Sequence, residues 1–152
     1  MQNAIHEHLN GLLSDTVVLE QKLRHYHWNV AGPQFFALHA KFEELYDHFA
    51  DVIDDVAERI LTIGGEPVRT LAAALEHTAL SEDPGKPAAL AMVENLKQDL
   101  RAIHGRAAAT IAAAEAADDR GTANLLDGLD DELEKTLWML DATLAAPAPQ
   151  GT

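Results

Sequence analysis

The sequence predicts an all-α fold: an antiparallel bundle of four long helices, with a short extra helix in the crossover between the second and the third. The composition favours helix-forming residues, contains only 5% aromatic residues and shows no alternating runs of Val, Ile and Thr. Apolar residues recur three and four positions apart in four long stretches, which Pro and Gly clusters separate. With 47% hydrophobic residues, the chain 1–152 is expected to form a single domain with one core.

The first two long helices are predicted at residues 1–31 and 34–63. In the first, apolar residues recur at helical spacing and the Gly32-Pro33 pair ends the run. The second carries a longer apolar stripe, and the segment 64–67, of sequence Gly-Gly-Glu-Pro, stops it. At 1.5 Å per residue, the second helix is expected to be roughly 40 Å long.

A short helix is predicted at residues 71–80, because an apolar stretch lies there between two breaker clusters. The third long helix is expected at 87–117, with Pro87 in its first turn, where the missing backbone N–H does no harm. The segment 118–121, of sequence Asp-Asp-Arg-Gly, ends it.

The fourth long helix is predicted at residues 122–145, where leucines recur three and four positions apart and Thr122 is a suitable N-cap. Residues 146–152 include two prolines and are expected to form a flexible tail. Four long amphipathic helices with one long crossover describe a ferritin-like bundle.

The chain is strongly acidic, with 11 Lys and Arg against 25 Asp and Glu, a formal net charge of -14 and a pI of about 4.7. Such a field attracts cations and repels phosphate backbones. The absence of cysteine leaves His nitrogen and carboxylate oxygen as the available metal ligands. The start of the chain lacks a secretory signal and no apolar run reaches membrane-spanning length, so we expect a cytoplasmic protein.

Two ligand pairs with i,i+4 spacing occur on the second predicted helix: His39 with Glu43, and Asp54 with Glu58. At about 100° per residue, both pairs face broadly the same side of the helix. Fifteen residues separate His39 from Asp54, which is about 22 Å along the axis. One ion therefore cannot touch both pairs of the same chain.

A second subunit could bring the two ligand pairs to one ion, because the pairs lie at equal distances in sequence from a point between His48 and Phe49. A two-fold axis there would align one subunit's first pair with its mate's second pair, and would make two identical sites. His27 adds a second nitrogen if residues 27–39 fold as a tight hairpin. Two histidines and three carboxylates, with open positions, suit Fe(II). The predicted set comprises His27, His39, Glu43, Asp54 and Glu58.

Ordinary structural roles account for many such residues as well. Carboxylates on a long helix are mostly solvated surface groups, and spacing alone does not decide whether these carboxylates are solvated or bind a metal. A lone helical histidine is more often structural or exposed than a ligand. We give that interpretation to His6, His8, His25, His48, His77 and His104.

Two segments around the predicted ligands read His27-Trp28-Asn29-Val30-x-Gly32-Pro33-x-Phe35-Phe36-x-Leu38-His39-x-x-Phe42-Glu43 and Asp54-x-x-Ala57-Glu58-Arg59-Ile60, followed by Gly64-Gly65. The last predicted helix adds Leu137-Trp138. This pattern resembles the Dps family, the small ferritin-like cages named for DNA protection in starved cells.

The resemblance implies a homo-dodecameric hollow shell of tetrahedral symmetry, built from two-fold dimers with ferroxidase sites at their interfaces. It implies oxidation of Fe(II), preferentially by hydrogen peroxide, and storage of ferric oxide inside the shell, which protects against oxidative damage. The family's metal residues carry over onto the predicted five, with the two histidines and Glu43 from one subunit and Asp54 and Glu58 from its neighbour. Position 43 is Asp in many relatives and Glu here, a longer arm with the same charge.

The resemblance also suggests roles for aromatic and acidic residues outside the ligand set. Trp28, beside a ligand, would intercept stray oxidising equivalents, although simple packing explains it equally well, and packing is the favoured reading for Tyr46. Family shells admit iron through acid-lined pores near the start of the last helix. Here the acids of that region, which Arg120 and Asn124 interrupt, are candidates to line such a pore, and a solvated charge run explains them equally well. These acids are Glu115, Asp118, Asp119, Asp127, Asp130 and Asp131.

Three other functions are considered. Many Dps relatives bind DNA through basic tails, but this sequence has no Lys or Arg before Lys22 or after Lys135, so we expect weak or no DNA binding. A ferritin or bacterioferritin proper would need Glu-x-x-His motifs, and the sequence contains none. A cage or scaffold with inactive metal residues remains open.

Overall fold

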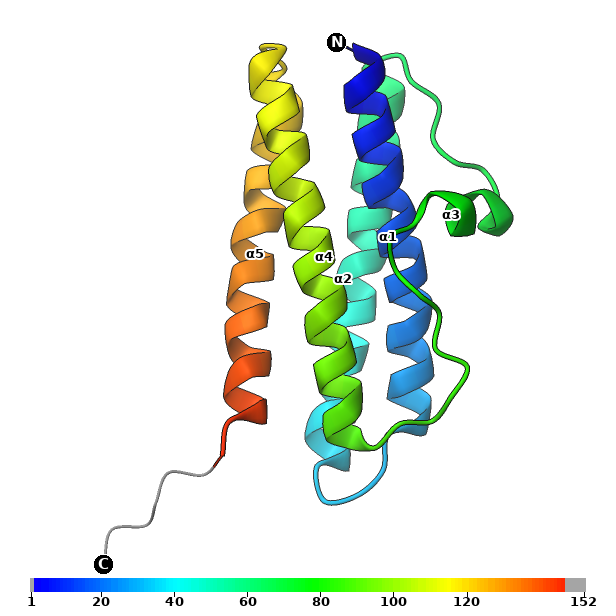
Figure 1. Ribbon diagram of the computed structural model, residues 1–152, viewed down its shortest axis with the longest axis vertical. Coiled ribbons are helices and arrows are strands. Elements are labelled where there is room, and N and C mark those ends of the chain that lie inside the picture. The colour runs from blue at the N-terminus through cyan, green and yellow to red at the C-terminus, as the bar shows by residue number, and fades with distance from the viewer. Residues whose placement is uncertain (1, 147–152) are drawn as a thin grey trace, which may run out of the picture.

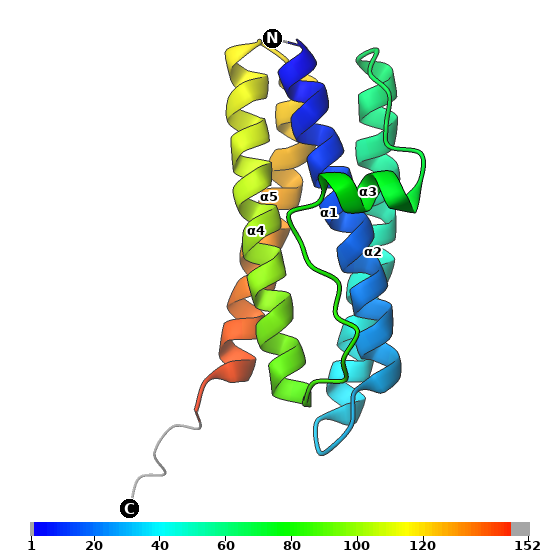
Figure 2. The same cartoon turned by 45° about the vertical axis from the view of Figure 1, so that its right-hand side comes forward.

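The computed structural model describes residues 2–146, which form five helices and no strand (Figure 1). α1 and α2 form one antiparallel hairpin, and α4 and α5 form a second. α2 and α4 point the same way, so the connection between them runs back along the bundle and carries α3 across α1 (Figures 1 and 2). The predicted all-α four-helix bundle with a short crossover helix is confirmed. The bounds are α1 Gln2–Asn29, α2 Phe35–Thr62, α3 Leu71–His77, α4 Ala89–Ala116 and α5 Arg120–Leu144.

The core lies between the four long helices. Each helix turns an apolar stripe inward at spacings of three and four, because these positions share one face of an α-helix. Full burial of each large apolar side chain stabilises the fold by about 1.5–3 kcal/mol. On α2, the helix with the candidate ligands, the buried stripe is Leu38, Phe42, Leu45, Phe49, Val52, Val56 and Ile60. Within residues 2–146, no helix is long and apolar enough to cross a membrane.

The ends of the third and fourth long helices differ from the predicted ones. α4 begins at Ala89, because Ala88 keeps an extended backbone with ψ of 156°, so Pro87 lies before the helix rather than in its first turn. α5 begins at Arg120, and its N-cap is Asp119, whose carboxylate accepts a hydrogen bond from the backbone N–H of Thr122. The prediction of Thr122 as the cap was therefore wrong. The tail expected at 146–152 lies, apart from Ala146, outside the described residues.

Buried Asp15 on α1 fixes the crossover. Its carboxylate accepts hydrogen bonds from the hydroxyl of Thr78 at 2.8 Å and from the backbone N–H of Ala79 at 2.7 Å. The same carboxylate pairs with Arg106 of α4 at 2.6 Å. Because Thr78 is held in an extended conformation by these bonds, α3 ends at His77 instead of reaching residue 80 as predicted. One side chain thus joins α1, the crossover and α4.

A second, partly buried polar network joins the end of α1 to the crossover and α4. The hydroxyl of Tyr26 donates to Asp83 of the crossover at 2.6 Å and accepts from Asn95 of α4 at 3.0 Å. Burial, together with the hydrogen bond to Asp83, raises the pKa of Tyr26 well above its ordinary value. That hydrogen bond lowers the pKa of Asp83. Tyr26 precedes His27, so the network anchors the end of α1 that carries the first candidate ligand.

Candidate metal centre

The turn between α1 and α2 brings two candidate ligands together. α1 ends at Asn29 and α2 begins at Phe35, and Gly32 has a φ of +101°, which residues with a Cβ rarely adopt. The chain therefore reverses within five residues. The imidazole rings of His27 and His39 stack face to face, with centroids 3.8 Å apart and planes 16° apart. The hairpin that the sequence analysis required for a second nitrogen is present.

Reciprocal hydrogen bonds fix the two rings. Nδ1 of His27 lies 2.7 Å from the backbone oxygen of His39, and Nδ1 of His39 lies 2.8 Å from the backbone oxygen of His27. A carbonyl oxygen can only accept, so both Nδ1 atoms donate. Each ring then keeps the lone pair of its Nε2 when neutral. This is the usual state of metal-ligating histidines, whose other nitrogen donates to a carbonyl or a carboxylate.

Aromatic side chains hold the pair of rings from both sides. Phe35 stacks on His39 at a centroid distance of 4.8 Å, and Tyr46 meets the ring of His27 edge-on at 5.4 Å. The guanidinium of Arg24 lies 4.3 Å from the centroid of Tyr46, within cation–π range. Burial, and then the nearby carboxylate of Glu43, raise the pKa of Tyr46, so its phenol stays neutral. The histidines therefore have little freedom to rotate.

The three candidate carboxylates, Glu43, Asp54 and Glu58, are exposed on α2. They lie within about 60° of one another around the helix, on the face that also carries His39. α2 is unbroken from Phe35 to Thr62, so the separation of about 22 Å between the two ligand pairs holds. Among residues 2–146, no three of the five candidate ligands lie close enough to share an ion. One subunit alone thus brings together the two histidines but not the full set.

Large apolar side chains frame this acidic face of α2. Phe36 is 86% exposed and Leu61 is 59% exposed, although both are residue types usually found in cores. By helix geometry both lie on the face of the carboxylates, within about 20° of Glu43. They are also equidistant in sequence from the point between His48 and Phe49. A two-fold axis at that point would place each against the other's copy in a second subunit.

Comparisons with known proteins decide the family. The ferritin-like domain family matches residues 6–147. A DNA protection during starvation protein of Brevibacillus brevis is 46% identical over 136 residues, which cover 90% of this chain and 91% of the relative. The crystal structure of a Dps protein from Bacillus brevis superposes with a TM-score of 0.93 at 44% identity, over 95% of this chain and 97% of that one. The chain belongs to the Dps family of ferritin-like proteins.

A less similar Dps structure is described in terms of its metal chemistry. The Dps protein of Vibrio cholerae O1, described as a member of a broad superfamily of ferritin-like diiron-carboxylate proteins, has a TM-score of 0.92 at 32% identity. The match covers 95% of this chain and 91% of the other. The resemblance to Dps and the ferritin-like fold class predicted from the sequence are both confirmed.

The remaining predicted residues of this Dps chain lie at the surface or are engaged elsewhere. Trp28 is 62% exposed, next to His27 in sequence, so it is open to solvent rather than packed in the core. Of the acids expected near a pore, Asp119 caps α5 and pairs with Arg59 at 2.6 Å, and Asp130 lies against His104 at 3.2 Å. The exposed acids of that group are Glu115, Asp118, Asp127 and Asp131.

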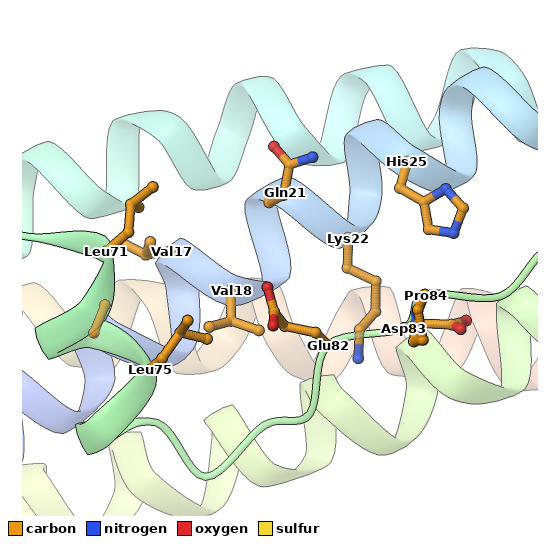
Figure 3. A pocket seen from close by; sticks show the side chains of 11 residues that line it. Val17, Val18, Gln21, Lys22, His25, Leu71, Leu75, Glu82, Asp83 and Pro84 are labelled. Carbon is orange, nitrogen blue, oxygen red and sulfur yellow. The ribbon is translucent and has the colours of Figure 1, made fainter.

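A groove of about 430 Å³ lies away from the candidate ligands. Figure 3 shows leucines of α3, among them Leu75, facing Val17 and Val18 of α1, with the polar residues of the following loop at the other end. His25, which borders the groove, lies about 160° around α1 from His27. The groove and the candidate metal centre of this Dps chain therefore occupy different sides of the α1–α2 hairpin.

Sequence reasoning missed one cluster of possible ligands. Histidines 6, 25 and 77 contact backbone oxygens, as expected for structural residues. His104 instead faces two carboxylates of α5, those of Asp130 and Glu134. The i,i+4 spacing of these two acids was a possible signal, but nothing in the sequence placed His104 opposite them.

Proposed function

We propose that this chain is a ferroxidase and iron-storage protein. It oxidises Fe(II), preferentially with hydrogen peroxide, at sites shared between two subunits, and stores ferric oxide inside a shell of twelve subunits. The observation that carries the proposal is the stacked His27–His39 pair, whose Nδ1 atoms both donate to backbone oxygens. Membership of a family with diiron-carboxylate relatives supports iron as the substrate.

Each proposed site combines nitrogens from one subunit with carboxylates from both. His27, His39 and Glu43 of one subunit meet Asp54 and Glu58 of its mate across the two-fold axis. Three carboxylates neutralise much of the charge of two Fe(II) ions, and the hard oxygen donors stabilise the Fe(III) product. The exposed apolar residues Phe36 and Leu61, equidistant from the same axis, favour this pairing of helices.

The chemistry needs no other cofactor. Two Fe(II) ions each give one electron to hydrogen peroxide, whose O–O bond breaks to give two hydroxide ions. Hydrolysis of the Fe(III) formed yields hydrous ferric oxide and releases protons. Peroxide reduced by two electrons in this way gives no hydroxyl radical, so the reaction protects against oxidative damage. Trp28, exposed beside His27, intercepts single oxidising equivalents that escape.

The first experiment replaces ligands from both halves of the site, in the double variant His39→Gln with Glu58→Gln. We expect fast peroxide-dependent iron oxidation to disappear while light scattering shows an unchanged assembly. The matched control replaces the exposed α3 residues Glu76 and His77 with Gln and should keep wild-type kinetics. Wild-type kinetics in the ligand variant would indicate a scaffold with inactive metal residues.

A complementation experiment tests the sharing between subunits. The single variants His39→Gln and Glu58→Gln each damage both sites of a symmetric dimer, so each should be inactive alone. A mixed dimer has one doubly damaged site and one intact site. Refolding the two variants together in equal amounts should therefore restore roughly one quarter of the sites. No recovery in co-assembled protein would show that the ligands come from one chain.

DNA binding is a second candidate, because the Brevibacillus brevis relative is named for DNA protection. The formal net charge of -14 opposes it, since binding to DNA rests on neutralising phosphates with Lys and Arg. We expect no mobility shift of duplex DNA at physiological salt. A tight complex there would contradict the electrostatic argument.

A further inference from the structure

A cluster of three metal-ligating side chains lies between α4 and α5, within one subunit. Asp130 and Glu134 are one turn apart on α5, and His104 faces them from α4. Nε2 of His104 lies 3.2 Å from Oδ1 of Asp130 and 3.6 Å from Oε1 of Glu134. The three ligand atoms lie within 4.8 Å of one another.

Two of these atoms lack the partners that buried polar atoms require. Nε2 of His104 and Oδ1 of Asp130 are shielded from solvent, and neither makes a hydrogen bond of acceptable geometry within residues 2–146. Such unsatisfied buried atoms are rare in folded proteins, and each calls for an explanation such as an ion. A cation bound by both atoms would give each of them a partner.

The spacing of the ligand atoms fits coordination of one ion. With bonds of about 2.1 Å, neighbouring ligands around a metal are about 3.0 Å apart in an octahedron and about 3.4 Å apart in a tetrahedron. The separations of Nε2 of His104 from the two carboxylate oxygens, 3.2 and 3.6 Å, are close to these values. A protonated imidazole paired with the carboxylates is the competing account of the same contacts.

The ligand set selects a class of cation. One imidazole nitrogen with two carboxylate oxygens suits a divalent first-row transition metal, whereas Ca²⁺ and Mg²⁺ prefer oxygen alone. With a neutral imidazole the cluster carries two negative charges. Two basic side chains of α4, Lys97 and Arg101, lie against Asp141 of α5, at 2.6 and 4.0 Å, rather than against the cluster.

We propose that His104, Asp130 and Glu134 form a binding site for a divalent transition metal ion that is complete within one subunit. It needs neither the two-fold axis nor the α2 ligands. The ion joins α4 to α5 and raises the stability of this hairpin. Its loss leaves the inter-subunit centre intact, so the two sites are separable by experiment.

The test uses the assembled full-length protein and Zn²⁺, which is redox-silent. Equilibrium dialysis of wild type and of His104→Gln should differ by one Zn²⁺ per subunit, whereas the control His77→Gln should match wild type. Glu134→Gln provides a second variant that spares the packing, because the side chain of Glu134 is 66% exposed. It should weaken the binding of that same ion.

Diffraction data collected at the zinc edge locate the ion. We expect an anomalous peak between α4 and α5 in wild type and in the double variant of His39 and Glu58, but none in His104→Gln. Failure of the inter-subunit centre would leave this peak unchanged. Equal Zn²⁺ binding by wild type and His104→Gln, or a wild-type crystal without the peak, would overturn the proposal in favour of an ion pair.

Discussion

Replacing Phe36 with Ser tests the proposed pairing of α2 helices most directly. Phe36 is 86% exposed in the subunit, and full burial of such a side chain contributes about 1.5–3 kcal/mol, so covering it contributes about 1.3–2.6 kcal/mol. The two-fold axis doubles this to about 3–5 kcal/mol per dimer. At 1.4 kcal/mol per factor of ten, the substitution should weaken the two-fold contact roughly a hundred- to several-thousand-fold.

The assay is a dilution series followed by analytical ultracentrifugation, with iron oxidation measured on the same samples. Phe36→Ser should dissociate at higher protein concentration than wild type and lose oxidation in parallel, because the proposed ligands separate with the subunits. Leu90→Ser is the control, since Leu90 is 44% exposed but lies at the start of α4. Equal dissociation of wild type and Phe36→Ser would refute the two-fold pairing.

A double-mutant cycle makes the same test at the level of one contact. If Phe36 of one subunit covers Leu61 of the other, the effects of Phe36→Ser and Leu61→Ser on dissociation must be non-additive, with a coupling of about 0.5–3 kcal/mol. Additive effects would show that the two side chains do not contact each other, and would contradict a two-fold axis near residues 48 and 49.

Two further predictions concern stability. Asp15→Ala should lower the free energy of unfolding by about 2–4 kcal/mol in urea titrations, because it leaves Arg106 without its buried partner, whereas Glu76→Ala on the surface of α3 should have little effect. Burial alone raises the pKa of Asp119, but the hydrogen bonds from its own helix and from Arg59 outweigh it and lower that pKa. The lowered pKa means that the carboxylate stabilises the fold fully above its unfolded pKa of about 3.9, and that this contribution is lost as the pH falls through the folded pKa. Asp119→Asn should therefore lower the free energy of unfolding by about 1 kcal/mol at pH 7, and this difference from wild type should become smaller below about pH 4. A difference that stays constant with pH would assign the effect to helix capping alone.

The periodic parts of the structure were accessible from the sequence, and the interactions across helices were not. Apolar residues three and four positions apart predict a buried stripe whatever the stripe packs against, so the four long helices could be predicted from the sequence pattern alone. The cap of α5 did not, because Asp119 and Thr122 are both good caps, and only Arg59, from another helix, favours Asp119. His104 shows the same limit, since its partners belong to the next helix.

The candidate centre was predictable to a similar extent. Spacing along α2 indicated two ligand pairs and an axis, since both are properties of a single helix. The orientation of His27 and His39 depends on how tightly the chain turns at Gly32. The sequence could not predict this turn, so the second nitrogen was expected only if residues 27–39 formed a tight hairpin. The exposure of Phe36 was also beyond reach, because an apolar residue at the start of a helix is expected to face the core as often as a partner.

The reciprocal hydrogen bonds between His27 and His39 mean that the nitrogen ligands are oriented when one chain folds, before two subunits pair. Folding of one chain suffices to orient the nitrogens, since both acceptors belong to the same hairpin. On the proposed geometry, Glu43 belongs to the same chain, but Asp54 and Glu58 reach these nitrogens only from another chain. A newly made, unassembled subunit then lacks the complete ligand set, so fast iron oxidation starts only after two subunits have paired.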